Sequence, residues 1–148
     1  MLPLVDVCFA NDIEAEMLTG VSLRPGGHLD TARVSEATRR MIALGVRSWA
    51  VIHFPEGACA RSVDGAALWQ GNVRVPPADI RGTAGAGDAF SAGVLYGVHE
   101  AWPMSECLHL GVCAAAASLH HATCSDAVGS RDACLALGRK HGFQPLSG

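Results

Sequence analysis

The stretch "GTAGAGDAFSAGVLYG", residues 82–97, joins a glycine-rich turn to the start of a helical pattern in this 148-residue chain. Glycines that precede a helix leave bare backbone N–H groups free to point at an anion, and the helix dipole favours negative charge there. Larger side chains at Gly85, Ala86 and Gly87 would keep a phosphate away from the backbone. We therefore interpret these three residues as a candidate anion hole.

Asp88 follows in the expected first helical turn. An acid beside an anion site is electrostatically unfavourable, so its presence there indicates a functional role. One such role is to accept the proton of a hydroxyl as a general base. The alternative is a tight-packing turn in which Asp88 is only a favourable first-turn acid; spacing alone leaves both open. The stretch is neither a Walker loop, since G-x-x-x-x-G-K-[ST] is absent, nor a dinucleotide fingerprint, since Phe90 occupies the third glycine position.

The composition indicates a globular chain with the size of one domain. Apolar residues make up 49% and charged residues 17% of the sequence, which argues against disorder. The net charge of -3 and the lack of a basic cluster argue against a nucleic-acid partner. The apolar stretches are interrupted before they reach membrane length, and the start lacks the pattern of a secretory leader. We therefore expect no membrane partner and a cytoplasmic location.

The cysteines favour buried free thiols in a reducing compartment. They are Cys8, Cys59, Cys107, Cys113, Cys124 and Cys134. None forms a C-x-x-C pair, and most have apolar neighbours. His120 and His121 lack ligand spacing, because adjacent residues of a helix point away from each other. We expect no metal site built from cysteine or histidine.

The periodicity predicts an α/β layer architecture. Strands are expected at "LPLVDVCFA" (2–10), "SWAVIHF" (48–54), "CARSV" (59–63) and "AALWQ" (66–70), and helices over 11–20, 30–45, 88–102, 105–122 and 131–142. Asp30 and Ser105 are expected to cap helices, and Gly20 and Gly45 to end them. Asp64-Gly65 and Gly71-Asn72 each predict a hairpin turn. The helix over 105–122 is apolar on nearly all sides, so we expect it in the centre of the fold.

The 82–97 stretch resembles the C-terminal signature of the ribokinase-like (PfkB) family of sugar kinases, D-T-x-G-A-G-D-x-F. The matching residues are Thr83, Gly85, Ala86, Gly87, Asp88 and Phe90. The resemblance implies a ribokinase-like fold, here the C-terminal part of a three-layer α/β/α sandwich. It also implies ATP-dependent phosphorylation of a sugar hydroxyl, with the G-A-G turn as anion hole, Asp88 as catalytic base, and ATP and Mg²⁺ as cofactors.

Two further segments resemble motifs of the family. "NDIEAEMLTG" is similar to the N-x-x-E segment that helps to hold magnesium and phosphate, which implies metal and cofactor binding by Asn11 and Glu14. The same spacing also predicts a helix capping box, and both interpretations can hold together. "AVIHFPEGACA" corresponds to the nucleotide-binding strand and turn T-L-G-x-x-G, of which Gly57 remains. The resemblance implies cofactor contacts for Gly57 and Thr83 as well.

The chain departs from the family pattern at two places. Gly82 stands where an aspartate opens the signature, at a position that helps to build the monovalent-cation site in relatives, so the change argues against potassium activation. His53, Phe54 and Pro55 replace T-L-G, which bears on nucleotide affinity and base preference.

The resemblance covers only the C-terminal half of family members, so residues 1–148 are interpreted as the nucleotide-binding and catalytic portion. The N-terminal half, which supplies most of the sugar pocket and the lid, has no counterpart here. Two functions remain open: a kinase acting on a small-molecule sugar, and a truncated, non-catalytic nucleotide-binding or self-assembling module. The first strand is expected to expose a sheet edge, which predicts a homo-oligomer or association with an N-terminal half.

Overall fold

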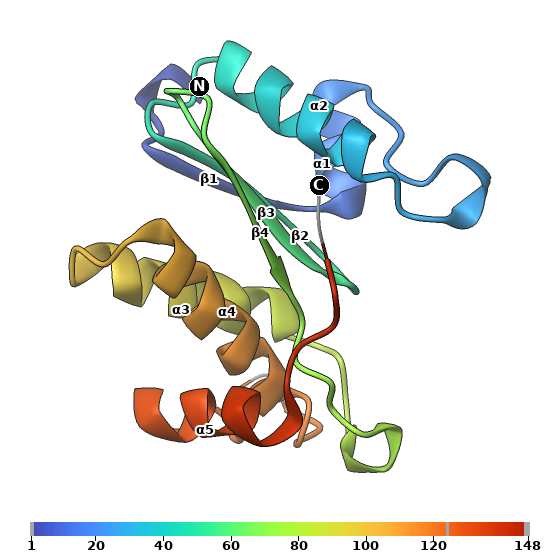
Figure 1. Cartoon of the computed structure of the whole chain (residues 1–148), viewed down its shortest axis with the longest axis vertical. Coiled ribbons are helices and arrows are strands. Elements are labelled where there is room, and N and C mark those ends of the chain that lie inside the picture. The colour runs from blue at the N-terminus through green and yellow to red at the C-terminus, as the bar shows by residue number, and fades with distance from the viewer. Residues whose placement is uncertain (1, 124, 147–148) are drawn as a thin grey trace. The chain divides into compact units, whose positions relative to one another are not determined.

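The computed structural model describes residues 2–123 and 125–146. The described residues form two compact units, residues 2–69 and 70–146 (Figure 1). Together they contain the strands and helices expected of an α/β protein.

The first unit is a sheet with two helices on it. Its elements are η1 (Leu2–Leu4), β1 (Val7–Asn11), α1 (Asp12–Thr19), η2 (Pro25–Gly27), α2 (Thr31–Ala43), β2 (Trp49–Phe54), β3 (Gly57–Ser62) and β4 (Ala67–Gly71), whose last two residues belong to the second unit. The strand order is β1-β2-β3-β4, with β1 parallel and β3 antiparallel to β2. The segment between β1 and β2 carries α1 and α2, which contact each other and the sheet (Figure 1).

The core of this unit lies between α2 and the central strands. Val34 and Met41 of α2 are fully buried, as are Val51 and Ile52 of β2. The three-four spacing of Val34, Ala37, Met41 and Leu44 predicts one buried face. The first three are buried, but Leu44, which follows the end of α2, is 46% exposed. Asp30 accepts hydrogen bonds from the first N–H groups of α2, which confirms the predicted cap. Cys59 of β3 is also buried, and this burial raises the pKa of its thiol to about 12, because the charged thiolate loses its contact with water.

The first strand differs from its prediction. Only Val7–Asn11 is extended, and Leu2–Leu4 forms a short 3₁₀ turn, because Pro3 lacks an N–H group for a sheet ladder. The strand was expected to be buried, but of its residues only Ala10 is fully buried, since β1 lies at the edge of the sheet. The prediction of an edge is therefore confirmed and the prediction of full burial is wrong.

The second unit is helical. It contains η3 (Pro77–Asp79), α3 (Ala86–His99), α4 (Met104–Ser118) and α5 (Arg131–His141). α4 packs against both α3 and α5 and buries most of its side chains, which confirms the prediction of a central apolar helix within this unit. α3 and α4 cross closely: a Cβ atom at Gly93 would lie 2.9 Å from the Cα atom of Gly111. The close crossing holds α3 firmly, and with it the turn that precedes α3.

Several predicted boundaries in the second unit are wrong. α4 begins after Pro103 instead of at a Ser105 cap, because proline suits the start of a helix, and α4 ends at Ser118 rather than 122. α3 begins at Ala86, two residues before the predicted start. Gly71-Asn72 does not close a hairpin.

The strand-like segment after Asn72 instead meets the C-terminal part of the chain. Val73 forms an antiparallel bridge with Phe143, and the Gln144 N–H donates to the Asn72 carbonyl at 2.8 Å. This partner lies about 70 residues away, so no local pattern revealed it. The Asp64-Gly65 turn, in contrast, is confirmed, with Gly65 at a φ of 95° between β3 and β4.

The described cysteines Cys8, Cys59, Cys107, Cys113 and Cys134 are free thiols, while Cys124 lies outside the described residues.

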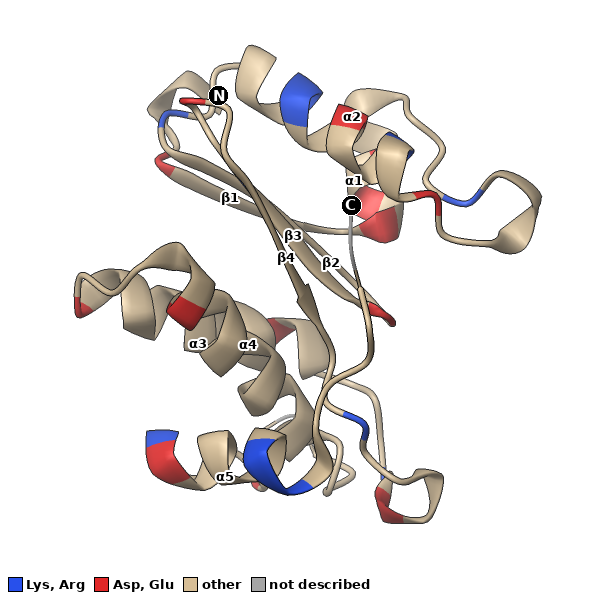
Figure 2. Ribbon diagram, in the orientation of Figure 1, with Lys and Arg blue, Asp and Glu red and all other residues tan. Residues whose placement is uncertain are grey.

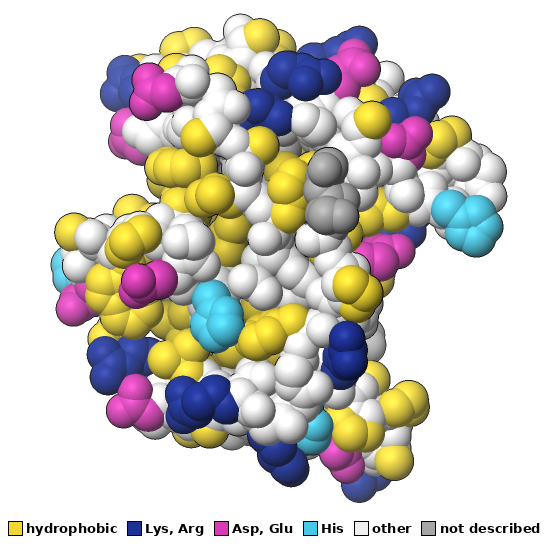
Figure 3. All heavy atoms as spheres, viewed as in Figure 1, with side chains coloured by type: hydrophobic (Ala, Val, Ile, Leu, Met, Phe, Trp, Pro, Cys, Tyr) yellow, Lys and Arg dark blue, Asp and Glu magenta, His cyan; other side chains and the backbone are white. Residues whose placement is uncertain are grey.

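No helix within the described residues is long and apolar enough to cross a membrane. Charged side chains lie mainly on helices and turns, for example Arg139 and Lys140, which face the negative end of the α5 dipole (Figure 2). Hydrophobic side chains also reach the surface (Figure 3). Ile13 and Met17 of α1 are 68% and 83% exposed.

Candidate functional site

The first part of the expected site is the start of α3. Gly85 precedes the helix in a left-handed conformation (φ 79°, ψ 0°), which favours glycine. No side chain caps this helix, and its first bond runs from the Ala89 N–H to the Gly85 carbonyl at 2.9 Å. The N–H groups of the first turn therefore lack a capping acceptor within the helix, as an anion site requires.

Asp88 lies in this first turn and is exposed to solvent. Asp132 occupies the first turn of α5 and pairs with Arg131 at 2.9 Å, whereas no ion pair within the described residues involves Asp88. Thr83 is also exposed, and its carbonyl is 3.4 Å from the Ala86 nitrogen. Asp88 is thus a carboxylate without a neutralising partner at the positive end of a helix.

Packing fixes the position of this turn. Phe90 is 2% exposed, and a Cβ atom at Gly111 would lie 3.0 Å from its ring and 2.7 Å from Val94. At Gly82 an added Cβ atom would lie 3.2 Å from the Ala122 Cα atom, so a side chain there would require the neighbouring backbone to shift. This close approach gives a local physical reason for glycine in place of the aspartate of the family signature.

The second part lies at the carboxyl ends of β1 and β2. Asn11 ends β1 and pairs in register with His53, one residue before the end of β2. α1 begins directly after Asn11. The Asn11 Oδ1 atom accepts from the Glu14 N–H at 2.8 Å, and the Glu14 Oε2 atom accepts from the Asn11 N–H at 2.9 Å. The predicted capping box is therefore confirmed with both of its bonds.

The capping box leaves ligand atoms available. Among the described residues the two bonds use Asn11 Oδ1 and Glu14 Oε2, so the Asn11 amide NH₂ group and the Glu14 Oε1 atom remain for other partners. Magnesium is commonly held by one or two carboxylates together with substrate phosphates. The donor set fits a magnesium ion shared with a nucleotide. It does not form a metal site by itself, since no described group of three His, Cys, Asp or Glu side chains could hold one.

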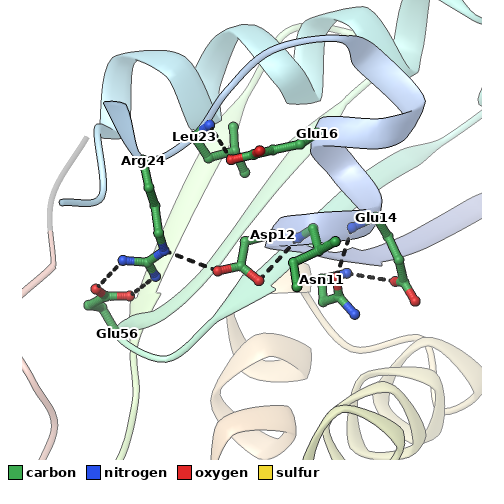
Figure 4. A network of polar contacts seen from close by, with 8 residues as sticks. Asn11, Asp12, Glu14, Glu16, Leu23, Arg24 and Glu56 are labelled. Atoms are coloured by element: carbon green, nitrogen blue, oxygen red, sulfur yellow. Dashed lines mark hydrogen bonds and ion pairs between the residues drawn. The ribbon is translucent and has the colours of Figure 1, made fainter. Parts of the chain in front are cut away.

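The turn between β2 and β3 lies at the same end of the sheet as the carboxyl ends of β1 and β2. Phe54 pairs with Gly57, so Pro55 and Glu56 form the turn and Gly57 begins β3. Arg24 donates to both carboxylate oxygens of Glu56, at 2.9 and 2.7 Å, and its Nε donates to Asp12 at 3.1 Å (Figure 4). The guanidinium holds the pKa of Glu56 below its ordinary value, mainly through these hydrogen bonds and against partial burial.

The ion-pair network of Arg24 was missed by the sequence analysis. Its bonded pairs are separated by up to 32 residues in the sequence, and Arg24 stands in a loop without periodicity. Of the predicted residues, Asn11, Glu14 and Gly57 lie in the first unit, at the end of the sheet where β1 and β2 have their carboxyl ends. Thr83 and the segment 85–88 lie together in the second unit, in the turn and first turn of α3.

Comparison with known proteins gives one consistent family. The model of the pfkB family carbohydrate kinases matches residues 1–130. The curated 5-dehydro-2-deoxygluconokinase from Geobacillus thermodenitrificans is 39% identical over 56 residues, which are 38% of this chain and 17% of that protein.

Solved structures agree on the fold. Ribokinase from Arabidopsis thaliana, complexed with ribose and ATP, matches with a TM-score of 0.78 at 23% identity over 92% of this chain and 41% of that one. Phosphofructokinase-2 from Escherichia coli, in complex with potassium, matches with a TM-score of 0.74 at 19% identity over 94% of this chain and 42% of that one. The predicted ribokinase-like α/β fold is confirmed, and the chain spans less than half the length of these structures.

Proposed function

The chain belongs to the pfkB family of carbohydrate kinases, and we propose that it carries the phosphate-binding and proton-accepting part of an enzyme that transfers a phosphoryl group from ATP to a sugar hydroxyl. One observation carries the proposal. Among the described residues, the start of α3 combines a left-handed glycine, the lack of a side-chain cap, and the Asp88 carboxylate, which forms no ion pair. Backbone donors and a proton acceptor are the two groups that this transfer needs.

In the proposed reaction, Asp88 accepts the proton of the sugar hydroxyl as that oxygen forms a bond to the terminal phosphorus. The bond between this phosphorus and the bridging oxygen breaks at the same time, and ADP leaves with that oxygen. The N–H groups at Gly85, Ala86 and Gly87 stabilise negative charge on the transferring phosphate. Because phosphoryl transfer requires little covalent work from the protein, most of the acceleration comes from position and charge stabilisation.

ATP is the proposed phosphoryl donor. The Arabidopsis relative is described in complex with ATP, which supports ATP as the donor. Asn11 and Glu14 would bind phosphate and magnesium with their unused atoms, and Gly57 and Thr83 would contact the nucleotide. Magnesium would supply positive charge at the phosphates when bound. The names of the relatives make 5-dehydro-2-deoxygluconate the first sugar derivative to test and ribose the second.

Isothermal titration calorimetry tests the nucleotide assignment. We expect weak binding of magnesium-ATP that is measurable at millimolar nucleotide, because phosphate donors are present in this chain. Removal of magnesium with EDTA should weaken the binding further, since the phosphate charges then lose their counterion. Folded protein that gives no binding heat at millimolar magnesium-ATP would contradict the proposal.

A second proposal is a self-associating, non-catalytic module. It is favoured by the edge position of β1 and by the exposed apolar side chains of Ile13 and Met17 on one side of α1. Unpaired strand edges and apolar surfaces promote association with another chain, either a second copy or an N-terminal half. The free thiols suit a reducing cytoplasm as the place of action.

Multi-angle light scattering tests the association. We expect a mass above 15.4 kDa that rises with concentration. The double substitution Ile13→Lys and Met17→Lys should lower the measured mass if α1 takes part. A monodisperse monomer at high concentration would count against this module.

A further inference from the structure

The residue before Arg24 is held in place by burial and hydrogen bonds within the first unit. The preceding residue, Leu23, has a fully buried side chain. The Leu23 N–H donates to the Glu16 carboxylate at 2.7 Å, and the Leu23 carbonyl accepts from the Asp30 N–H at 2.9 Å. Because its neighbour is held in this way, the backbone at Arg24 has little freedom left to lose, and the ordering cost of its contacts falls mainly on the side-chain rotamers.

The guanidinium of Arg24 joins two acidic side chains. Its Nη1 and Nη2 atoms form a bidentate pair with Glu56, and its Nε atom bonds Asp12 on the other side (Figure 4). Arg24 and Asp12 are 25% and 22% exposed, and Glu56 is 38% exposed. The planar fork of arginine fixes the direction of both partners, which a lysine with its single ammonium group would not do.

The two partners lie next to the proposed ligand atoms. Asp12 stands between Asn11 and Glu14 in the sequence, and Glu56 directly precedes Gly57. We propose that Arg24 is a positioning residue, which holds the first turn of α1 and the β2–β3 turn at the spacing that a magnesium-nucleotide needs. The inference rests on the proposed function and adds to it a residue outside the family motifs.

The expected effects on stability and on affinity differ. Ion pairs with partial solvent exposure contribute little to folding stability, because water screens the charges. Groups that support a ligand site act through geometry, and their loss weakens metal or ligand binding by about 10- to 100-fold. Loss of Arg24 should therefore change nucleotide affinity much more than unfolding.

The test is a calorimetric cycle on the full chain with magnesium-ATP as the probe. Arg24→Met should weaken binding about tenfold. Glu56→Gln should weaken it less, because the contact with Asp12 remains. The double variant should bind as Arg24→Met does, within about twofold, since both changes break the same link. Arg40→Met is the matched control, because Arg40 also pairs with an acid, Glu36, in the same unit. It should leave the affinity unchanged.

Hydrogen exchange without nucleotide supplies an independent readout. Arg24→Met should raise exchange in residues 11–14 and 56–57 together, and Arg40→Met should not. An equal affinity loss in Arg40→Met, or additive losses in the double variant, would overturn the inference. A rise in only one of the two segments would overturn it as well. If the unmodified chain binds no nucleotide, the proposed function fails and the nucleotide role of Arg24 fails with it. A joint rise in exchange would then still support the physical link between the two turns.

Discussion

The starts of α1 and α3 use the same backbone groups in opposite ways. At α1, Asn11 and Glu14 satisfy each other's N–H groups through a capping box. At α3, Gly85 provides the turn but no capping side chain. The Ala86 N–H donates to the Thr83 carbonyl at 3.4 Å, whereas the following N–H groups of the first turn have no side-chain cap and can face an external acceptor. A capped start can bind a ligand only with the side-chain atoms that the cap leaves over. An uncapped glycine start offers the backbone itself.

The other helices show that absence of a cap is not sufficient. α2 and α5 are capped by Asp30 and Ser130. α4 also lacks a capping side chain, but Pro103 precedes it, and the Met104 side chain at its start is only 7% exposed. The start of α3 differs because it combines small residues, a left-handed glycine and an exposed acid. Substitutions at three positions test this contrast, beginning with the largest expected effect.

Asp88→Asn removes the proton acceptor at the open helix start. We expect phosphoryl transfer to a sugar to fall by about 10²–10⁴-fold, the usual contribution of a general base, while nucleotide affinity stays nearly the same. The measurement is a coupled kinase assay in the longer protein context. Asp132→Asn, which changes the first-turn acid of α5 in the same way, is the control and should retain activity. An Asp88→Asn protein with most of its turnover would exclude Asp88 as the base.

Gly87→Val tests whether the backbone of this turn contacts phosphate. A branched side chain would keep the phosphate away from the N–H groups, so we expect magnesium-ATP affinity to fall by about tenfold or more, which corresponds to the loss of one or two charge-assisted hydrogen bonds. Ala92→Val introduces the same side chain at an exposed position of the same helix and should bind normally. Equal affinities of the two variants in calorimetry would argue against a phosphate site.

Two substitutions of Asn11 distinguish its role as the cap of α1 from its proposed role in ligand binding. Asn11→Ala should lower the free energy of unfolding by about 1 kcal/mol, because the Glu14 N–H loses its acceptor. Asn11→Asp keeps that acceptor and should be nearly as stable, yet it removes the amide NH₂ group and should weaken magnesium-ATP binding. Urea denaturation and calorimetry measure the two effects. If Asn11→Asp binds nucleotide as the unmodified chain does, Asn11 serves only as a cap.

Local signals predicted the elements that depend on neighbouring residues. The Asp30 cap, the Gly20 helix end, the Asp64-Gly65 turn and the buried face of α2 all depend on residues within a few positions of each other. The glycine-rich start of α3 belongs to the same class, because the glycines themselves allow the turn. For this reason the helix-start candidates could be named from the sequence, although the start of α3 was placed two residues late.

By itself, the sequence determined the α/β class, the family motif and the residues at both helix starts, since each depends on short-range patterns. Only the tertiary structure decided that β1 pairs in parallel with β2, that Val73 pairs with Phe143, and that Arg24 bridges Asp12 and Glu56. These features depend on contacts between residues far apart in the chain. Such contacts form only when packing brings the segments together, so no local spacing encodes them.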